Sequence, residues 1–214
     1  MQIVFNRGVE LLDTLDDLPD QEAIRHLPQF FRADPDMVRR LGGPFLRRFL
    51  GAAPVSSARY TVIDTKVHML MPGWHACIPG WHCDDFHRPG GGQPDLEGMA
   101  EVRSRHVCVA VGPTAQPEFV AEPMTLPAPS ELDCRNRALY ALYHELIEER
   151  RPRTVQPASG QLVRFDCFDF HRGRPAEGRA WRFFARLTQS DHLAPRNEVR
   201  TQTQVYLTAP FEQW

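Results

Sequence analysis

The chain has 214 residues, a length that corresponds to one domain or to one domain with a modest extension. Its 25 basic and 27 acidic residues give a net charge of −2, which argues against a protein built mainly to hold nucleic acid or anionic membrane. The 14 glycines and 19 prolines predict many turns but exclude collagen-like and low-complexity classes. Lysine occurs once, as Lys66, so arginine is this chain's usual cation and a single arginine carries little information.

The sequence has the features of a cytoplasmic protein without a membrane partner. No run reaches the 18 or so apolar residues of a membrane-spanning helix, and residues 1–12 lack the basic start and long apolar stretch of a signal peptide. Five cysteines without a C-x-x-C pair favour reduced thiols over a disulfide framework. The minor alternative is a structural zinc site made by His75, Cys77, His82 and Cys83.

Residues 1–55 are expected to form a helical N-terminal layer. Asp20 can cap a helix whose apolar stripe runs to Phe31, and Asp34 followed by Pro35 has the pattern of a cap and first turn of a second helix. The segment 42–44, Gly-Gly-Pro, should interrupt that second helix before it resumes.

From residue 60 onward the pattern changes to short β-rich runs separated by turns. These runs cover residues 60–64, 66–71, 106–111, 161–171, 181–188 and 201–207. One helix is expected between Ser130 and Pro152, and no linker separates two domains. We therefore predict a single domain over 1–214 that is mainly β with flanking helices, in which a sandwich or barrel core spans 60–190 and a C-terminal extension spans 191–214.

The segment 79–87 carries most of the chemistry in this sequence. His82 and Asp84 are two residues apart, which on a strand places an imidazole and a carboxylate on the same face, where both can bind one metal ion. The best candidate for a third ligand is His171, at the end of the run 161–171. Iron(II) suits a site in which two imidazoles and one carboxylate bind the metal and leave its other coordination positions open. A bulge in the strand would exchange Asp84 for Asp85.

Two arginines follow the third candidate ligand. The turn at 172–178 predicts that residues 179–188 fold back as a hairpin on the strand of His171, which sets position 171 opposite approximately 181. Arg182 and Arg186 share one face of that strand, and both of its faces carry bulky or apolar groups. We therefore expect inward guanidinium groups that bind a carboxylate through two hydrogen bonds.

The order of these four positions resembles that of the iron(II)- and 2-oxoglutarate-dependent oxygenases. His82-x-Asp84 is followed after 86 residues by His171 and eleven residues later by Arg182. The resemblance covers about residues 60–190 and implies a double-stranded β-helix, or jelly roll. It also implies that His82, Asp84 and His171 hold Fe(II), and that Arg182 binds the distal carboxylate of 2-oxoglutarate. Arg186 is the alternative for that role or a substrate contact.

The resemblance further implies hydroxylation, or a related oxidation, of a small molecule or of an amino-acid or peptide side chain. Candidate substrate contacts are His87, Glu118 and Trp81, and the glycine-rich loop 88–98 is a candidate lid. Two alternatives stay open. A cupin-like metal enzyme would use the same ligands without 2-oxoglutarate, and a non-catalytic jelly-roll binding module would need none of them.

Overall fold

The computed structural model describes residues 2–54, 57–86, 94–96, 104–132 and 138–207. It is mainly β, with antiparallel sheets and a smaller number of helices. The strands are β1 (Gln2–Phe5), β2 (Glu10–Thr14), β3 (Phe30–Phe31), β4 (Tyr60–Leu70), β5 (Ser104–Val111), β6 (Pro117–Val120), β7 (Met124–Pro127), β8 (Thr154–Val155), β9 (Gln161–Asp166), β10 (His171–Gly173), β11 (Ala180–Ser190) and β12 (Glu198–Val199). The helices are α1 (Gln21–Arg25), α2 (Pro35–Leu41), α3 (Gly43–Ala52) and α4 (Leu139–Arg150), with a short 3₁₀ turn at Pro129–Glu131.

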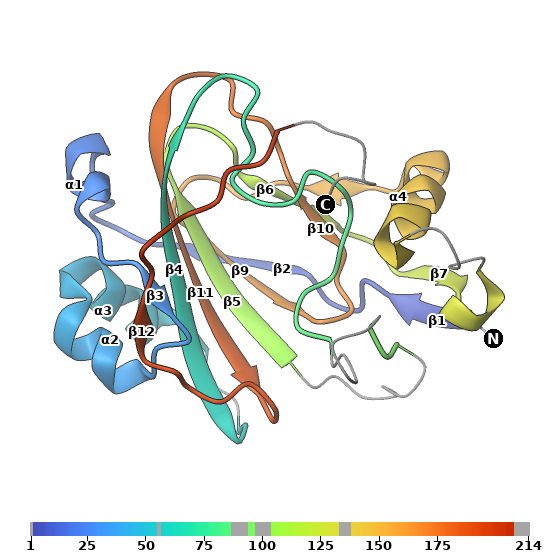
Figure 1. Ribbon diagram of the computed structural model, residues 1–214, viewed down its shortest axis with the longest axis horizontal. Coiled ribbons are helices and arrows are strands. Elements are labelled where there is room, and N and C mark those ends of the chain that lie inside the picture. Colours follow the sequence, from blue (N-terminus) through green and yellow to red (C-terminus); the bar gives the residue numbers. More distant parts are fainter. Residues whose placement is uncertain (1, 55–56, 87–93, 97–103, 133–137, 208–214) are drawn as a thin grey trace.

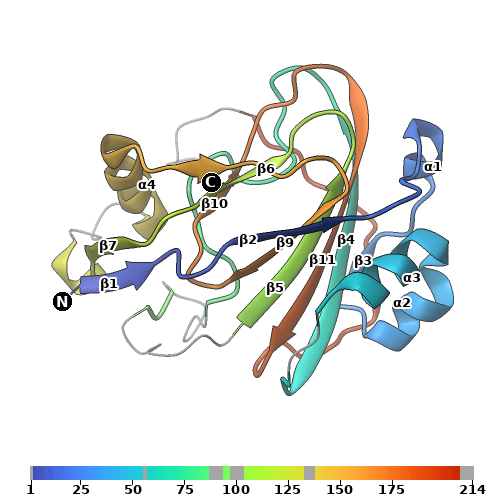
Figure 2. The same ribbon diagram turned by 180° about the vertical axis from the view of Figure 1, so that it is seen from behind.

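The largest sheet has the strand order β2-β9-β5-β11-β4. Strand β11 lies between the edge strand β4 and the central strand β5, and it pairs with β4 along its whole length and with β5 from Phe183 onward. Side chains that alternate along each strand point to opposite faces. The outer face, which includes Ile63, Val67 and Phe183, packs against α1–α3 in one hydrophobic cluster. Figures 1 and 2 show these helices gathered on that side of the sheet.

A second, smaller sheet with the order β10-β6-β8 faces the other side, which we call the inner face of the large sheet. His82 joins this sheet by a bridge to His171. Helix α4 covers the outside of this half of the molecule, where its buried residues Leu139, Tyr143 and Ile147 pack with β1, β7 and the turn after β9. The inner face and the smaller sheet therefore enclose the space in which the candidate ligands lie.

The two helix caps expected at Asp20 and Asp34 are confirmed. Asp20 caps α1 by accepting a hydrogen bond from the Ala23 amide at 2.8 Å, and Asp34 caps α2 by accepting one from Met37 at 2.7 Å. Helix α3 begins at Gly43, where the sequence predicts an interruption. None of the helices in the described ranges has the length and apolar character needed to cross a membrane.

Four expectations about secondary structure are wrong. The first fifty residues are not only helical, because β1, β2 and β3 lie among them and the first helix ends at Arg25. The runs 60–64 and 66–71 are one continuous strand, β4, whereas the run 161–171 is broken between β9 and β10. The run 201–207 is not a strand, and β12 precedes it.

The predicted hairpin between the strand of His171 and residues 179–188 is also wrong. His171 pairs with Phe119 on β6, and Arg182 pairs with His68 on β4. The chain crosses from the smaller sheet to the larger one between β10 and β11. A turn in the sequence indicates where a strand ends, but not which sheet the next strand joins.

Candidate metal centre

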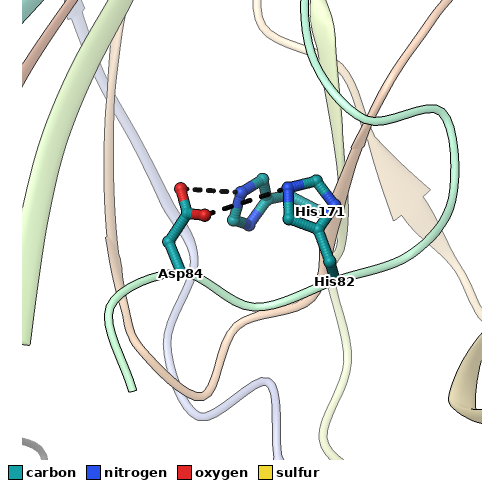
Figure 3. A group of neighbouring side chains, drawn as sticks. All are labelled: His82, Asp84 and His171. Carbon is teal, nitrogen blue, oxygen red and sulfur yellow. Dashed lines mark ion pairs between the residues drawn. The ribbon is translucent and has the colours of Figure 1, made fainter. Parts of the chain in front are cut away.

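His82, Asp84 and His171 come together at one point between the two sheets (Figure 3). One potential ligand atom from each residue lies within 4.8 Å of the other two. The Asp84 carboxylate faces both imidazoles, with Oδ1 3.9 Å from His82 Nε2 and Oδ2 3.3 Å from His171 Nε2. This donor set of two nitrogens and one carboxylate could hold a metal ion.

The orientation of both imidazoles suits a metal. His82 Nδ1 lies 2.8 Å from the Gly80 carbonyl, and His171 Nδ1 lies 3.1 Å from the Asp169 carbonyl. Because a carbonyl only accepts, each Nδ1 carries a proton, and Nε2 is the ring nitrogen that faces Asp84 and could bind a metal. Burial, followed by the charge of His171, lowers the pKa of His82 to about 4, so the His82 ring is neutral and able to bind metal near pH 7.

Backbone contacts hold the two ligand segments together. The amide of His82 donates to the carbonyl of His171 at 3.0 Å, and the amide of His171 donates to the carbonyl of His82 at the same distance. Two residues further on, a Cβ at Gly173 would lie 2.5 Å from the Cys77 carbonyl oxygen, so only glycine allows this close approach. The segment around Asp84 is otherwise irregular, and Asp85 has a left-handed backbone with φ of 59°.

Asp84 also pairs with Arg186. One guanidinium group pairs with Asp84 Oδ2 and also lies 3.1 Å from Asp85 Oδ2. Burial would raise the pKa of Asp84, but Arg186 and then His171 hold it well below its usual value, so the carboxylate is ionised. Burial raises the pKa of Asp85. Asp84, and not Asp85, is therefore the carboxylate that the structure places with the two histidines.

Arg182 lies on the same face of β11 but has a different environment. Its side chain is buried, and in the described part of the chain its guanidinium has no ion pair and its Nε has no hydrogen bond. Burial lowers the pKa of Arg182, because no carboxylate compensates its charge. The structure thus separates the roles of the two arginines, since Arg186 is paired within the protein and Arg182 is not.

Both arginines and all three candidate ligands line one cavity of about 180 Å³. Three phenylalanines give it an apolar wall, and charged residues of β4 and of the C-terminal segment give it a polar one. Its lining is Asp64, Lys66, Ala76, Cys77, Ile78, His82, Asp84, Cys108, Pro117, Phe119, Phe165, His171, Arg182, Phe184, Arg186, Arg200 and Tyr206.

The residues predicted to contact substrate are not brought together there. Trp81 is buried in the cluster with α4, where its Nε1 donates to Glu148 at 2.7 Å, and Arg172 stacks on its ring. Glu118 points away from the cavity and pairs with Arg172 at 2.7 Å, although its neighbours on β6 line the cavity. His87 and most of the candidate lid, 88–98, lie outside the described residues.

Four charged or polar lining residues were not predicted from the sequence, namely Asp64, Lys66, Arg200 and Tyr206. For Asp64 and Lys66 a signal existed, because a continuous strand from residue 60 would place both on one face. Arg200 and Tyr206 come from the C-terminal segment, which reaches the cavity through pairing of β12 with β3 and a bridge between Tyr206 and His75.

Comparison with known proteins gives little beyond this geometry. No family model matches the chain, and no curated protein matches it. Among solved structures, the chain is similar to the crystal structure of an oxidoreductase of the 2OG-Fe(II) oxygenase family from Burkholderia pseudomallei. The two share 15% sequence identity over 89% of this chain and 88% of that chain, with a TM-score of 0.40. A likeness at this level does not assign the chain to a family.

Proposed function

We propose that the protein is a non-haem iron(II)- and 2-oxoglutarate-dependent dioxygenase. In this reaction O₂ and 2-oxoglutarate are consumed, the substrate is hydroxylated or otherwise oxidised, and succinate and CO₂ are released. The substrate is a small molecule or an amino-acid or peptide side chain. The observation that carries the proposal is the meeting of His82, Asp84 and His171 in a cavity that also holds Arg182, a buried arginine without a carboxylate partner in the described residues.

The strand order supports a double-stranded β-helix for the core. In chain order, β4, β5, β9 and β11 belong to the large sheet. Between them, the segment of His82 and the strands β6, β8 and β10 belong to the smaller one. Antiparallel strands that alternate between two facing sheets in this way are typical of a jelly roll.

The donor set fits iron(II). Two neutral imidazoles and one carboxylate on one side of a metal, with the remaining positions open, form the ligand set of non-haem iron(II) oxygenases. When bound, iron(II) supplies the activation of molecular oxygen. The protein's part is to fix both Nε2 atoms and the Asp84 carboxylate at one point. The carbonyls of Gly80 and Asp169 hold the two rings at Nδ1, and Arg186 holds the carboxylate.

Arg182 fits the distal carboxylate of 2-oxoglutarate better than Arg186 does. A guanidinium binds a carboxylate through two parallel hydrogen bonds, and Arg186 already makes such charged contacts to Asp84 and Asp85. A carboxylate at Arg182 would compensate a buried charge that has no partner in the described part of the protein. Phe119, Phe165 and Phe184 give the cavity an apolar wall that helps to keep water from the reacting groups.

The test is anaerobic binding followed by single exposure to oxygen. Metal-stripped protein is titrated with Fe(II) and 2-oxoglutarate by calorimetry, oxygen is admitted, and succinate is measured. We expect both to bind and succinate to form slowly even without the true substrate. His82→Ala should lose iron binding, whereas His26→Ala, a change of the exposed histidine that follows α1, should retain it.

The outcomes separate the alternatives. Equal iron binding by wild-type protein and His82→Ala contradicts the metal site. Iron binding without 2-oxoglutarate binding favours a cupin-like enzyme. If Arg182→Met binds 2-oxoglutarate as tightly as wild type while Arg186→Met does not, the cosubstrate is held by Arg186.

A further inference from the structure

Lys66 is the only lysine in a chain that uses arginine for its other 24 basic residues. It lies on the inner face of β4 and lines the cavity beside Phe184, its register partner on β11. The next inward positions on either side of this pair are Asp64 and His68. Within the residues that the structure describes, Lys66 makes no ion pair and no hydrogen bond through its side chain.

The other cations of the cavity have partners or an assigned role. Arg186 pairs with Asp84 and Asp85, and Arg200 pairs with Asp64 at 2.6 Å. Arg182 is assigned above to the distal carboxylate of 2-oxoglutarate. The lining therefore has four cations, namely Lys66, Arg182, Arg186 and Arg200. Three carboxylates oppose them: Asp64 and Asp84 of the lining, and Asp85 beside Arg186. Iron(II) and the 2-oxoglutarate dianion carry equal and opposite charges, so one positive charge, that of Lys66, remains.

A partly buried ammonium group without a counter-charge is costly. Burial, and then the positive charge of Arg200, lowers the pKa of Lys66, which shows how little the surroundings compensate it. An anion placed beside it would stabilise the charged amine. A lysine suits this task because its compact charge sits on a flexible stem and accepts an oxyanion from several directions.

We propose that Lys66 binds an anionic group of the substrate, a carboxylate, phosphate or sulfate. The rest of the substrate would lie along the phenylalanine wall, so its class is a small molecule with an apolar body and one oxyanion. Arg200 and Tyr206 line the same cavity as Lys66, which gives the C-terminal segment a part in substrate selection. This inference rests on the proposed function, because it presupposes that 2-oxoglutarate occupies Arg182.

A single lysine makes the proposal directly observable. Protein labelled with ¹³C at the lysine Cε gives one side-chain NMR resonance. The protein is loaded with Zn(II), a diamagnetic substitute for iron, and with saturating 2-oxoglutarate. It is then titrated with benzoate or with benzamide, which has the same shape without the charge. We expect a saturable shift of the Lys66 resonance with benzoate and none with benzamide. Inorganic phosphate and sulfate distinguish the source of the oxyanion.

Variants provide a second measurement. By calorimetry, Lys66→Met should bind benzoate about tenfold more weakly, the loss expected when a hydrogen bond to a charged group is removed. Lys66→Arg, which keeps the charge, should restore most of the affinity. Neither change should alter 2-oxoglutarate affinity by more than about twofold. Arg39→Met removes an exposed cation of α2 and serves as the control.

Three results would overturn the proposal. The resonance could be unmoved by every anion, it could move equally with benzamide, or it could move with 2-oxoglutarate alone and lose its response to benzoate, which would make Lys66 a second anchor of the cosubstrate. If 2-oxoglutarate does not bind at all, the proposed function fails separately. The benzoate titration on the zinc-loaded protein then still tests Lys66 as an anion site.

Discussion

The inner and outer faces of the large sheet are made by alternate residues of the same strands and differ in the charge and packing of their side chains. On β11, Phe183, Ala185 and Leu187 point outward into the cluster with the helices. Arg182 and Arg186 point inward and line the cavity. The outer face consists mainly of apolar side chains in close contact, whereas the inner face carries several charged side chains around the cavity. Neighbouring residues of one strand therefore belong alternately to the hydrophobic core and to the candidate site.

Hydrogen bonding shows the same difference. Thr65 is a buried polar residue of the outer face, and its hydroxyl donates to the Pro28 carbonyl and accepts from the Phe30 amide, both at 2.7 Å. On the inner face, the Nε atoms of Arg182 and Arg186 and the Nε2 atom of His106 are buried without a hydrogen bond in the described structure. Buried polar groups are almost always satisfied, so a cluster of exceptions marks a place where ligands or water complete the pairing.

The largest expected effect is on the outer face. Phe183 is fully buried and stacks edge-to-face on Phe45 with ring centroids 5.8 Å apart. Phe183→Ala should lower the free energy of unfolding by about 3–5 kcal/mol, because it leaves a cavity in a close-packed cluster. Phe184→Ala, one residue away on the inner face, should cost only about 1 kcal/mol, because its side chain already borders open space. Urea unfolding measures both, and equal losses would contradict the distinction between the faces.

Substitutions of the two inward arginines, Arg182 and Arg186, should have very different effects on the free energy of unfolding. Arg186→Met leaves Asp84 and Asp85 without their cation and should destabilise the protein by about 3 kcal/mol, the lower end of the range for a broken buried pair because Asp84 is partly exposed. Arg182→Met removes a buried charge that has no partner in the described residues, so stability should change by less than about 1 kcal/mol or rise. Denaturant unfolding of metal-free protein compares them. A large loss in Arg182→Met would show that its charge is compensated within the protein.

Metal bound by His82, Asp84 and His171 should stabilise the folded protein. Anaerobic Fe(II) at about a hundred times its dissociation constant should raise the free energy of unfolding by about 2.7 kcal/mol, because only the folded chain brings the three ligands together. His171→Ala should abolish this gain, and His26→Ala should keep it. Thermal unfolding with and without metal gives the measurement. An undiminished gain in His171→Ala would place the metal elsewhere.

What the sequence predicted correctly depended on local physics. The caps at Asp20 and Asp34 and the alternation within strands need only neighbouring residues. Arg182 is an example of what alternation within one strand can predict. Its selection relied on a hairpin that does not form, yet it lies in the cavity, because the face to which a residue points is set by alternation along its own strand and not by the strand's partner.

What the sequence could not predict depended on pairing between distant segments. His171 pairs with Phe119 and Arg182 with His68, and no local signal chooses between these partners and a hairpin. Arg200 reaches the cavity wall only because β12 pairs with β3, at the other end of the chain. Loop-closure entropy depends weakly on length, so such contacts are possible at many separations, and only packing of the whole molecule selects among them.

The smallest expected effect compares one threonine from each face. Thr188 accepts or donates one hydrogen bond, to His106 Nδ1 at 3.0 Å, and His106 Nε2 has no partner in the described residues. Thr188→Val should therefore cost about 1 kcal/mol, the usual value of one buried hydrogen bond. Thr65→Val removes two hydrogen bonds, which join Pro28 and the start of β3 to the outer face. It should lower the free energy of unfolding by about twice as much. Chemical unfolding of the two variants resolves this difference. If Thr188→Val were the more damaging change, the inner face would contribute to stability as much as to binding, because its polar groups would then form a network that depends on each member.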